Sequence, residues 1–136
     1  MTYRIGRLID HVHIRVSDLV ASRRFYAAVL ESLGQGDALH GSGDHFFADE
    51  LYVDASEGQV SRIHLAFQAQ TRAQVDAFHA AAIAAGGTDN GAPGLRDYHA
   101  QYYAAFVRDP DGNNIEAVCD APVTRTAPFI EIDRTA

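Results

Sequence analysis

The chain has 136 residues, enough for one ordinary domain or for two small repeats that share a core. Apolar residues make up 47% and charged residues 21%, which excludes a disordered chain. A net charge of −7 disfavours binding to nucleic acid or to an anionic membrane. There is no apolar run of membrane-spanning length and only one cysteine, so we expect a cytoplasmic protein without an internal disulfide.

The first half of the chain is expected to begin with a strand and a helix. Residues 9–16 alternate apolar and polar side chains, which predicts a half-buried strand. Ser17 or Asp18 is expected to cap the helix that follows, and Gly34 to end it. Three short strand-like pieces then follow, at residues 37–40, 45–48 and 50–55.

The second half repeats this order. Residues 63–69 alternate in the same way, and Thr71 with Gln74 forms a capping box for a helix that Gly86 and Gly87 stop. The glycine- and proline-rich stretch at 89–97 predicts a mobile loop at the mouth of a cavity. Two more strands are expected, at residues 101–108 and 115–119. An Asp-Gly hairpin turn at residues 109–114 connects them.

This order predicts an α+β fold made of two βαβββ modules. The modules, about residues 8–56 and 60–120, are expected to form one curved, cup-like mixed sheet with the helices on its outer face. They constitute one domain over residues 1–122. Residues 123–136 form a C-terminal tail whose apolar patch PFIEI is expected to cover a sheet edge or a partner.

The polar strand faces, which the helices cannot cover, are expected to line the concave side. Two histidines and one or two carboxylates would converge there from four strands, a set that suits a divalent first-row metal and leaves positions open for substrate. The alternative is a group of hydrogen-bonded strand histidines with a solvated glutamate. The residues on these faces are His11, His13 and Arg15, then Glu50, Tyr52 and Asp54, then His64 and Gln68, and finally Asn114, Glu116 and Val118.

Three segments together resemble a known superfamily. The segments HVHIRVSDLVASRRFYAAVL, IHLAF and DPDGNNIEAV are similar to those of the vicinal oxygen chelate superfamily. That superfamily includes glyoxalase I, extradiol dioxygenases, fosfomycin-resistance thiol transferases and bleomycin-binding proteins. The resemblance covers residues 8 to about 120 and implies two βαβββ modules around one divalent metal ion, which is Zn, Ni, Fe, Mn or Co.

The resemblance also implies a set of metal ligands. These are His11 on the first strand, His64 on the fifth and Glu116 on the last. A fourth ligand, where present, is a carboxylate for which Glu50 is the candidate, although Tyr52 on the same face is an alternative that would leave three ligands. Glu116 or Glu50 would also be the catalytic group that moves the proton in a glyoxalase-like isomerisation.

Other side chains are expected to face the substrate or to be structural. Alternation allows only one of Tyr102 and Tyr103 to point inward. Arg15 is expected to pair with a carboxylate across the sheet, with anchoring of an anion as the alternative, and Cys119 is expected to be a buried structural thiol. The substrate-facing candidates are His13, Tyr52, His99, Tyr102 and Tyr103.

The function implied by the resemblance is that of a metal-dependent, glyoxalase-like enzyme. It would act as a lyase or isomerase, a dioxygenase or a thiol transferase on a small molecule with vicinal oxygens. The alternatives are a non-catalytic binding protein of the bleomycin-resistance type and an enzyme of another chemistry, such as an acyl-thioester epimerase. We expect a homodimer with a small-molecule substrate. In the superfamily that the chain resembles, paired chains sometimes exchange modules, so that each site draws ligands from both chains.

Overall fold

The computed structural model describes residues 2–5, 8–122 and 130–133. The first module contains a strand, a helix, a 3-10 turn and three further strands: β2 (Val12–Val16), α1 (Leu19–Ser32), η1 (Gly36–Ala38), β3 (His40–Gly41), β4 (His45–Ala48) and β5 (Leu51–Ala55). The second module has the same order without the turn: β6 (His64–Gln68), α2 (Arg72–Ala84), β7 (Thr88–Leu95), β8 (Tyr103–Arg108) and β9 (Asn114–Cys119). The predicted two-module α+β fold is therefore confirmed.

The two modules have the same sheet topology. One sheet has the strand order β2-β5-β4-β3 and the other β6-β9-β8-β7, each with one parallel pair and two antiparallel pairs. In this common order β2 corresponds to β6 and β5 to β9, which allows residues to be compared between modules. The described strands of the two sheets are not hydrogen-bonded to each other, whereas we expected one continuous cup-like sheet.

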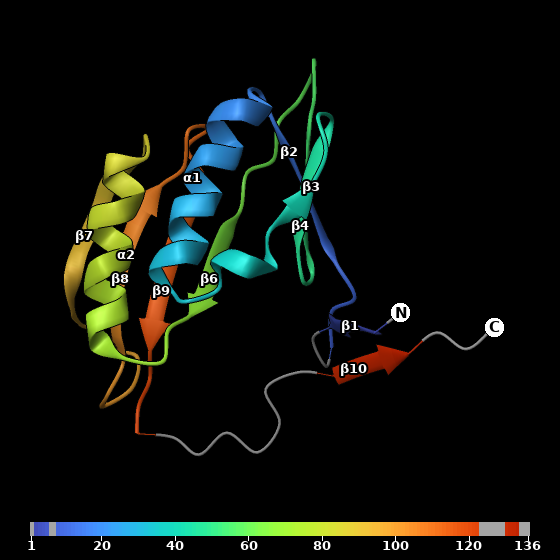
Figure 1. Ribbon diagram of the computed structural model, residues 1–136. Helices are drawn as coiled ribbons and strands as arrows, with labels where there is room; N and C mark the ends of the chain where they lie inside the picture. Colours follow the sequence, from blue (N-terminus) through green and yellow to red (C-terminus); the bar gives the residue numbers. More distant parts are fainter. Residues whose placement is uncertain (1, 6–7, 123–129, 134–136) are drawn as a thin grey trace.

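Each helix covers the apolar face of its sheet, and the two helices lie side by side (Figure 1). Asp18 rather than Ser17 caps α1, since its Oδ1 accepts from the Ala21 N–H at 3.1 Å. Thr71 caps α2 in the same way, by accepting from the Gln74 N–H at 3.1 Å. The fully buried core joins both modules through Ile14, Val16, Phe25, Val29, Phe46, Val53, Val75, Phe78, Val107 and Ile115.

Two expectations about individual segments differ from the structure. The stretch expected to be a mobile loop forms β7, whose register shifts around Gly91 accommodate the glycines and proline. Because β7 is an edge strand, Pro93 can lack its N–H without breaking the sheet. Residues 36–38 form a 3-10 turn rather than part of a strand, because the Ala38 N–H bonds back to the Gln35 carbonyl at 3.0 Å.

A small additional sheet was not expected from the sequence. β10 (Ile130–Asp133) pairs antiparallel with β1 (Thr2–Ile5), and Figure 1 shows this pair apart from the two four-stranded sheets. The last part of the predicted PFIEI patch thus covers a strand from the other end of the chain, while Pro128 and Phe129 lie outside the described residues. No helix in the described part of the chain has the length and apolar character needed to cross a membrane.

The turn between β8 and β9 links several elements. The Asp109 carboxylate accepts hydrogen bonds from the Tyr26 hydroxyl of α1 at 2.6 Å and from the Asn113 N–H at 2.8 Å. The Asn113 side chain accepts from the Ile63 N–H at 2.8 Å, at the start of β6. Asp111 accepts from the Ser17 backbone N–H at 3.1 Å. The DPDGNN motif is therefore a hairpin turn that also fastens the two modules together.

Candidate functional site

A histidine and a buried carboxylate meet on the face of the second sheet that points away from α2. β6 and β9 are parallel neighbours in which His64 pairs with Asn114 and Glu116 pairs with Ala66. This register allows His64 Nε2 to lie 2.7 Å from Glu116 Oε1. The Glu116 side chain is only 2% exposed, whereas that of His64 is 54% exposed. The pair therefore has one buried member and one that solvent or a ligand can reach.

Tyr102 completes the surroundings of this carboxylate. Its hydroxyl donates a hydrogen bond to Glu116 Oε2. Burial raises the pKa of Tyr102 above its ordinary value, and the bond to Glu116 raises it further, because both disfavour the phenolate. Tyr102 is thus a protonated donor that orients Glu116. Tyr103 points to the opposite face, where its hydroxyl donates to Asp76 of α2 at 2.7 Å.

The Tyr102 ring is supported by two neighbours in the segment between β7 and β8. Tyr98 and His99 both meet it edge-on, with centroid distances of 5.0 and 5.6 Å. His99 in turn places Nδ1 2.6 Å from Asp120 Oδ2. His99 therefore contacts the site through Tyr102, and no hydrogen bond joins it to Glu116 among the described residues.

The first sheet presents a row of aromatic rings on its own helix-free face. His40 pairs with Phe47, Phe47 with Tyr52, and Tyr52 with His13, so the row crosses all four strands. His13 Nε2 also lies 2.7 Å from Asp54 Oδ1. Arg15 Nε lies 3.7 Å from the same oxygen, so Arg15 pairs with a carboxylate across the sheet as expected.

His11 lies beside this row, outside the strand. Together with His13, Phe47, Asp49, Leu51 and Tyr52 it lines a pocket of about 300 Å³. Its imidazole is 65% exposed, and Nδ1 lies 2.8 Å from the carboxylate of its neighbour Asp10. The structure therefore places His11 with His13 and Tyr52 rather than with His64 and Glu116.

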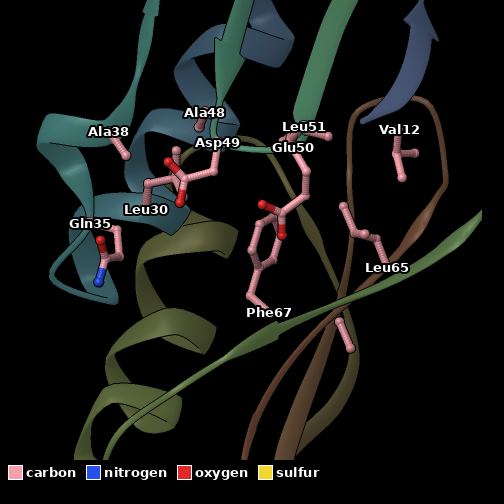
Figure 2. A pocket seen from close by; sticks show the side chains of 11 residues that line it. Val12, Leu30, Gln35, Ala38, Ala48, Asp49, Glu50, Leu51, Leu65 and Phe67 are labelled. Atoms are coloured by element: carbon pink, nitrogen blue, oxygen red, sulfur yellow. The ribbon is translucent and has the colours of Figure 1, made fainter. Parts of the chain in front are cut away.

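Glu50 lies in a different pocket, shown in Figure 2. Its side chain points towards the ring of Phe67, with the Asp49 carboxylate also directed into the same space. The pocket measures about 150 Å³, and its other lining residues are mainly apolar, among them Val12, Leu30, Leu51 and Leu65. Glu50 is thus not brought together with His64 and Glu116 in this chain.

The matching topology of the modules indicates which residue corresponds to Glu116. Glu116 is paired with Ala66, which follows His64 by two residues. In the first module, Tyr52 is paired with His13, which follows His11 by two residues. If His11 corresponds to His64, as the strand order implies, then Tyr52 corresponds to Glu116. The register therefore favours the three-ligand alternative over a fourth ligand at Glu50.

The donor chemistry of the pair fits part of a metal site. An imidazole and an ionisable carboxylate lie side by side, and a phenol orients the carboxylate from behind, which is a common arrangement around bound metals. Within the described residues, no three His, Cys, Asp or Glu side chains are close enough to hold one metal ion. The chain alone therefore supplies two adjacent candidate ligands.

Two residues at the site were missed by sequence reasoning. Phe106 is paired with Glu116, and its ring lies 6.0 Å from that of His64. Arg96 follows β7, with its guanidinium carbon 5.3 Å from the centroid of the Phe106 ring. The alternation of β8 could have identified Phe106. The sequence does not identify Arg96, because the glycine- and proline-rich pattern of residues 89–97 predicts a loop.

Comparison with known proteins agrees with this architecture. The family model described as "Glyoxalase/Bleomycin resistance protein/Dioxygenase superfamily" matches residues 8–117. The protein YqjT of Bacillus subtilis (strain 168) is 33% identical over 128 residues, covering 81% of this chain and 97% of YqjT. The chain therefore belongs to the glyoxalase/bleomycin resistance protein/dioxygenase superfamily.

Solved structures support the same assignment. A glyoxalase/bleomycin resistance protein from Albidiferax ferrireducens T118 is similar with a TM-score of 0.71 and 38% identity, over 82% of this chain and 98% of that one. A glyoxalase-related enzyme from Fulvimarina pelagi has a TM-score of 0.63 at 19% identity, over 89% and 99%. This second likeness shows the fold alone.

Proposed function

We propose that this protein is a divalent-metal-dependent, glyoxalase-like enzyme that acts on a small molecule with vicinal oxygens. The observation that supports this best is the His64–Glu116 pair, in which a carboxylate 2% exposed lies 2.7 Å from an accessible imidazole. The partners of this buried carboxylate are an imidazole and a phenol rather than a fixed positive charge, and imidazole and carboxylate are both common ligands of divalent metals. Family membership makes a metal ion the expected cation.

In this proposal, His64 and Glu116 are two of three protein ligands. The third is His11 of a second copy of the chain, because His11 of the same chain lies in the separate pocket next to Tyr52. Two exposed apolar side chains near His11, Leu8 at 92% and Ile9 at 48%, are consistent with a contact surface there. The proposed assembly is accordingly a homodimer with sites between its subunits.

The bound metal ion would supply Lewis-acid stabilisation of negative charge that develops on the substrate oxygens. The chain's own residues would hold and orient the reacting groups. The Tyr102 hydroxyl keeps Glu116 Oε2 engaged, whereas Oε1 lies 2.7 Å from Nε2 of His64, the solvent-accessible member of the pair. From there Oε1 can accept or return a proton next to a substrate carbonyl, the role expected of a general base.

The test is the metal content of the untagged protein, measured by elemental analysis after incubation with Zn, Ni, Fe, Mn or Co. We expect close to one metal ion per chain in the wild type and a large loss in Glu116→Ala and His64→Ala. Glu50→Ala is the matched control, since Glu50 is an exposed carboxylate in a different pocket. A wild type that binds none of these ions would contradict the proposal.

A non-catalytic small-molecule-binding protein is the second candidate function. The aromatic row on the first sheet favours it, because His40, Phe47, Tyr52 and His13 offer stacking surfaces beside a pocket of about 300 Å³. His64→Ala separates the two candidates. An enzyme should lose turnover and metal together, whereas a sequestering protein would keep its affinity for its ligand.

A further inference from the structure

The second sheet places an arginine on the same face as the His64–Glu116 pair. The Arg96 guanidinium carbon lies 5.3 Å from the centroid of the Phe106 ring, a distance typical of cation–π contact. Phe106 is directly paired with Glu116 in the sheet, and its ring lies 6.0 Å from the His64 ring. The same phenylalanine thus separates a fixed positive charge from the candidate metal ligands.

The protein holds this guanidinium in a defined position. Nη2 of Arg96 donates to the Ala92 carbonyl at 2.7 Å, and Nη1 contacts the Leu95 carbonyl at 3.4 Å. The Arg96 backbone N–H donates to the Tyr102 carbonyl at 2.8 Å, which ties it to the residue that orients Glu116.

Two glycines leave room for the guanidinium. A Cβ added at Gly94 would lie 3.1 Å from Nη1, and one at Gly91 would lie 3.3 Å from Nη2. Both distances are shorter than ordinary van der Waals contact, so a side chain at either position would require the guanidinium to shift by a few tenths of an ångström, and at Gly91 it would also press on the Phe106 ring at 3.0 Å. The absence of side chains at Gly91 and Gly94 is therefore part of what allows the Arg96 guanidinium to lie 5.3 Å from the centroid of the Phe106 ring.

The charge of this arginine is not compensated by a carboxylate. Arg96 forms no ion pair with any acidic side chain in the described part of the chain, although the protein has a net charge of −7. Its two hydrogen-bond acceptors are neutral carbonyls, which occupy two of the five guanidinium N–H donors. Planar N–H donors that remain available match the oxygens of a carboxylate or a phosphate.

We propose that Arg96 binds an oxyanion group of the substrate and so selects small molecules that bear a carboxylate or a phosphate. This inference rests on the proposed function, since it places the anion beside the His64–Glu116 site. The Phe106 ring holds the guanidinium through the cation–π contact, and the missing side chain at Gly94 leaves room for it. Arg96 is thereby the residue that determines substrate charge.

The test uses the full chain in metal-free form, with inorganic phosphate and acetate as separate probes at constant ionic strength. Binding is followed by NMR, through the Arg96 side-chain N–H signal and the backbone N–H signals of β8 and β9. We expect saturable shifts in the wild type and an affinity at least about tenfold weaker in Arg96→Gln, as for the loss of a charged hydrogen bond. The stronger probe identifies the preferred oxyanion.

Arg72→Gln is the matched control, because Arg72 also lies over an aromatic ring, that of Tyr103 at 5.1 Å, but on the α2 side of the sheet. It should leave both affinities unchanged, while Gly94→Ala should weaken them by displacing Arg96. Equal binding by wild type and Arg96→Gln, or an equal loss in Arg72→Gln, would overturn the inference and indicate adventitious anion binding only. The metal content of Arg96→Gln should equal that of the wild type. This measurement distinguishes failure of the anion site from failure of the proposed metal site.

Discussion

Glu116 illustrates how a single side chain depends on its immediate neighbours. Its two carboxylate oxygens are engaged by different elements, Oε1 by His64 of β6 and Oε2 by Tyr102 before β8. No arginine pairs with it among the described residues, so its orientation depends on one imidazole and one phenol. A change in either partner should therefore alter what Glu116 can bind.

Removing the Tyr102 hydroxyl should weaken the proposed metal site without destroying it. Tyr102→Phe frees Glu116 Oε2, and a residue that orients a ligand typically contributes 10- to 100-fold to metal affinity. We expect an affinity at least about tenfold lower for the ion found in the wild type, measured by competition with a chelator. Tyr98→Phe is the control, since Tyr98 is 65% exposed and meets the Tyr102 ring edge-on, whereas the hydroxyl bonded to Glu116 belongs to Tyr102. Unchanged affinity in Tyr102→Phe would contradict this role.

At the level of elements, the contact between α1 and the β8–β9 turn should make stability depend on pH in the alkaline range. Burial raises the pKa of Tyr26 well above its ordinary value of 10.0, and the nearby Asp109 carboxylate raises it further. The folded protein therefore resists ionisation of Tyr26 while the unfolded chain ionises near its ordinary pKa. The stability that Tyr26 contributes is fully present below its unfolded-state pKa. It is lost as the pH rises from the unfolded-state pKa towards the higher folded-state pKa.

Tyr26→Phe tests this prediction. At neutral pH it should lower the free energy of unfolding by about 1–2 kcal/mol, because Asp109 Oδ2 keeps only its bond from Asn113. Above pH 10 the difference between wild type and Tyr26→Phe should shrink, as measured by urea denaturation across pH 8–11. A difference that stays constant over this range would show that Tyr26 does not titrate as described.

Local periodicity was sufficient to predict most elements but not all. The alternation in residues 63–69 and 115–119 predicted β6 and β9, and with them the face shared by His64 and Glu116. It failed for β7, because glycine and proline weaken a strand signal even where bulges at an edge accommodate them. Arg96 was missed for the same reason.

Relations between modules could not be predicted from local pattern at all. The sequence places His11 and His64 in equivalent positions, yet the distance between them depends on how two separate sheets are arranged. Likewise, the choice between Glu50 and Tyr52 required the β2–β5 register, which pairs Tyr52 with His13. Neither the arrangement of the two sheets nor the register between two strands can be predicted from the alternation within one strand.

At the scale of the whole molecule, the predicted dimer has a specific consequence for mixed variants. If each site combines His64 and Glu116 of one chain with the partner subunit's His11, then His11→Ala and Glu116→Ala each disable both sites of their own homodimer. A mixed dimer would still contain one intact site, with His11 from the Glu116→Ala chain and His64 and Glu116 from the His11→Ala chain.

Co-refolding the two variants in equal amounts should therefore restore metal binding that neither shows alone. Random pairing makes half of the dimers mixed, each with one of its two sites intact, so about a quarter of the wild-type metal content should return. The control is Glu116→Ala mixed with His64→Ala, which removes two ligands contributed by the same module and should restore nothing. Sedimentation at micromolar concentration checks that each sample is dimeric. A monomer, or no recovery in a dimeric mixture, would contradict the shared site, because a site built within one chain cannot be repaired by its neighbour.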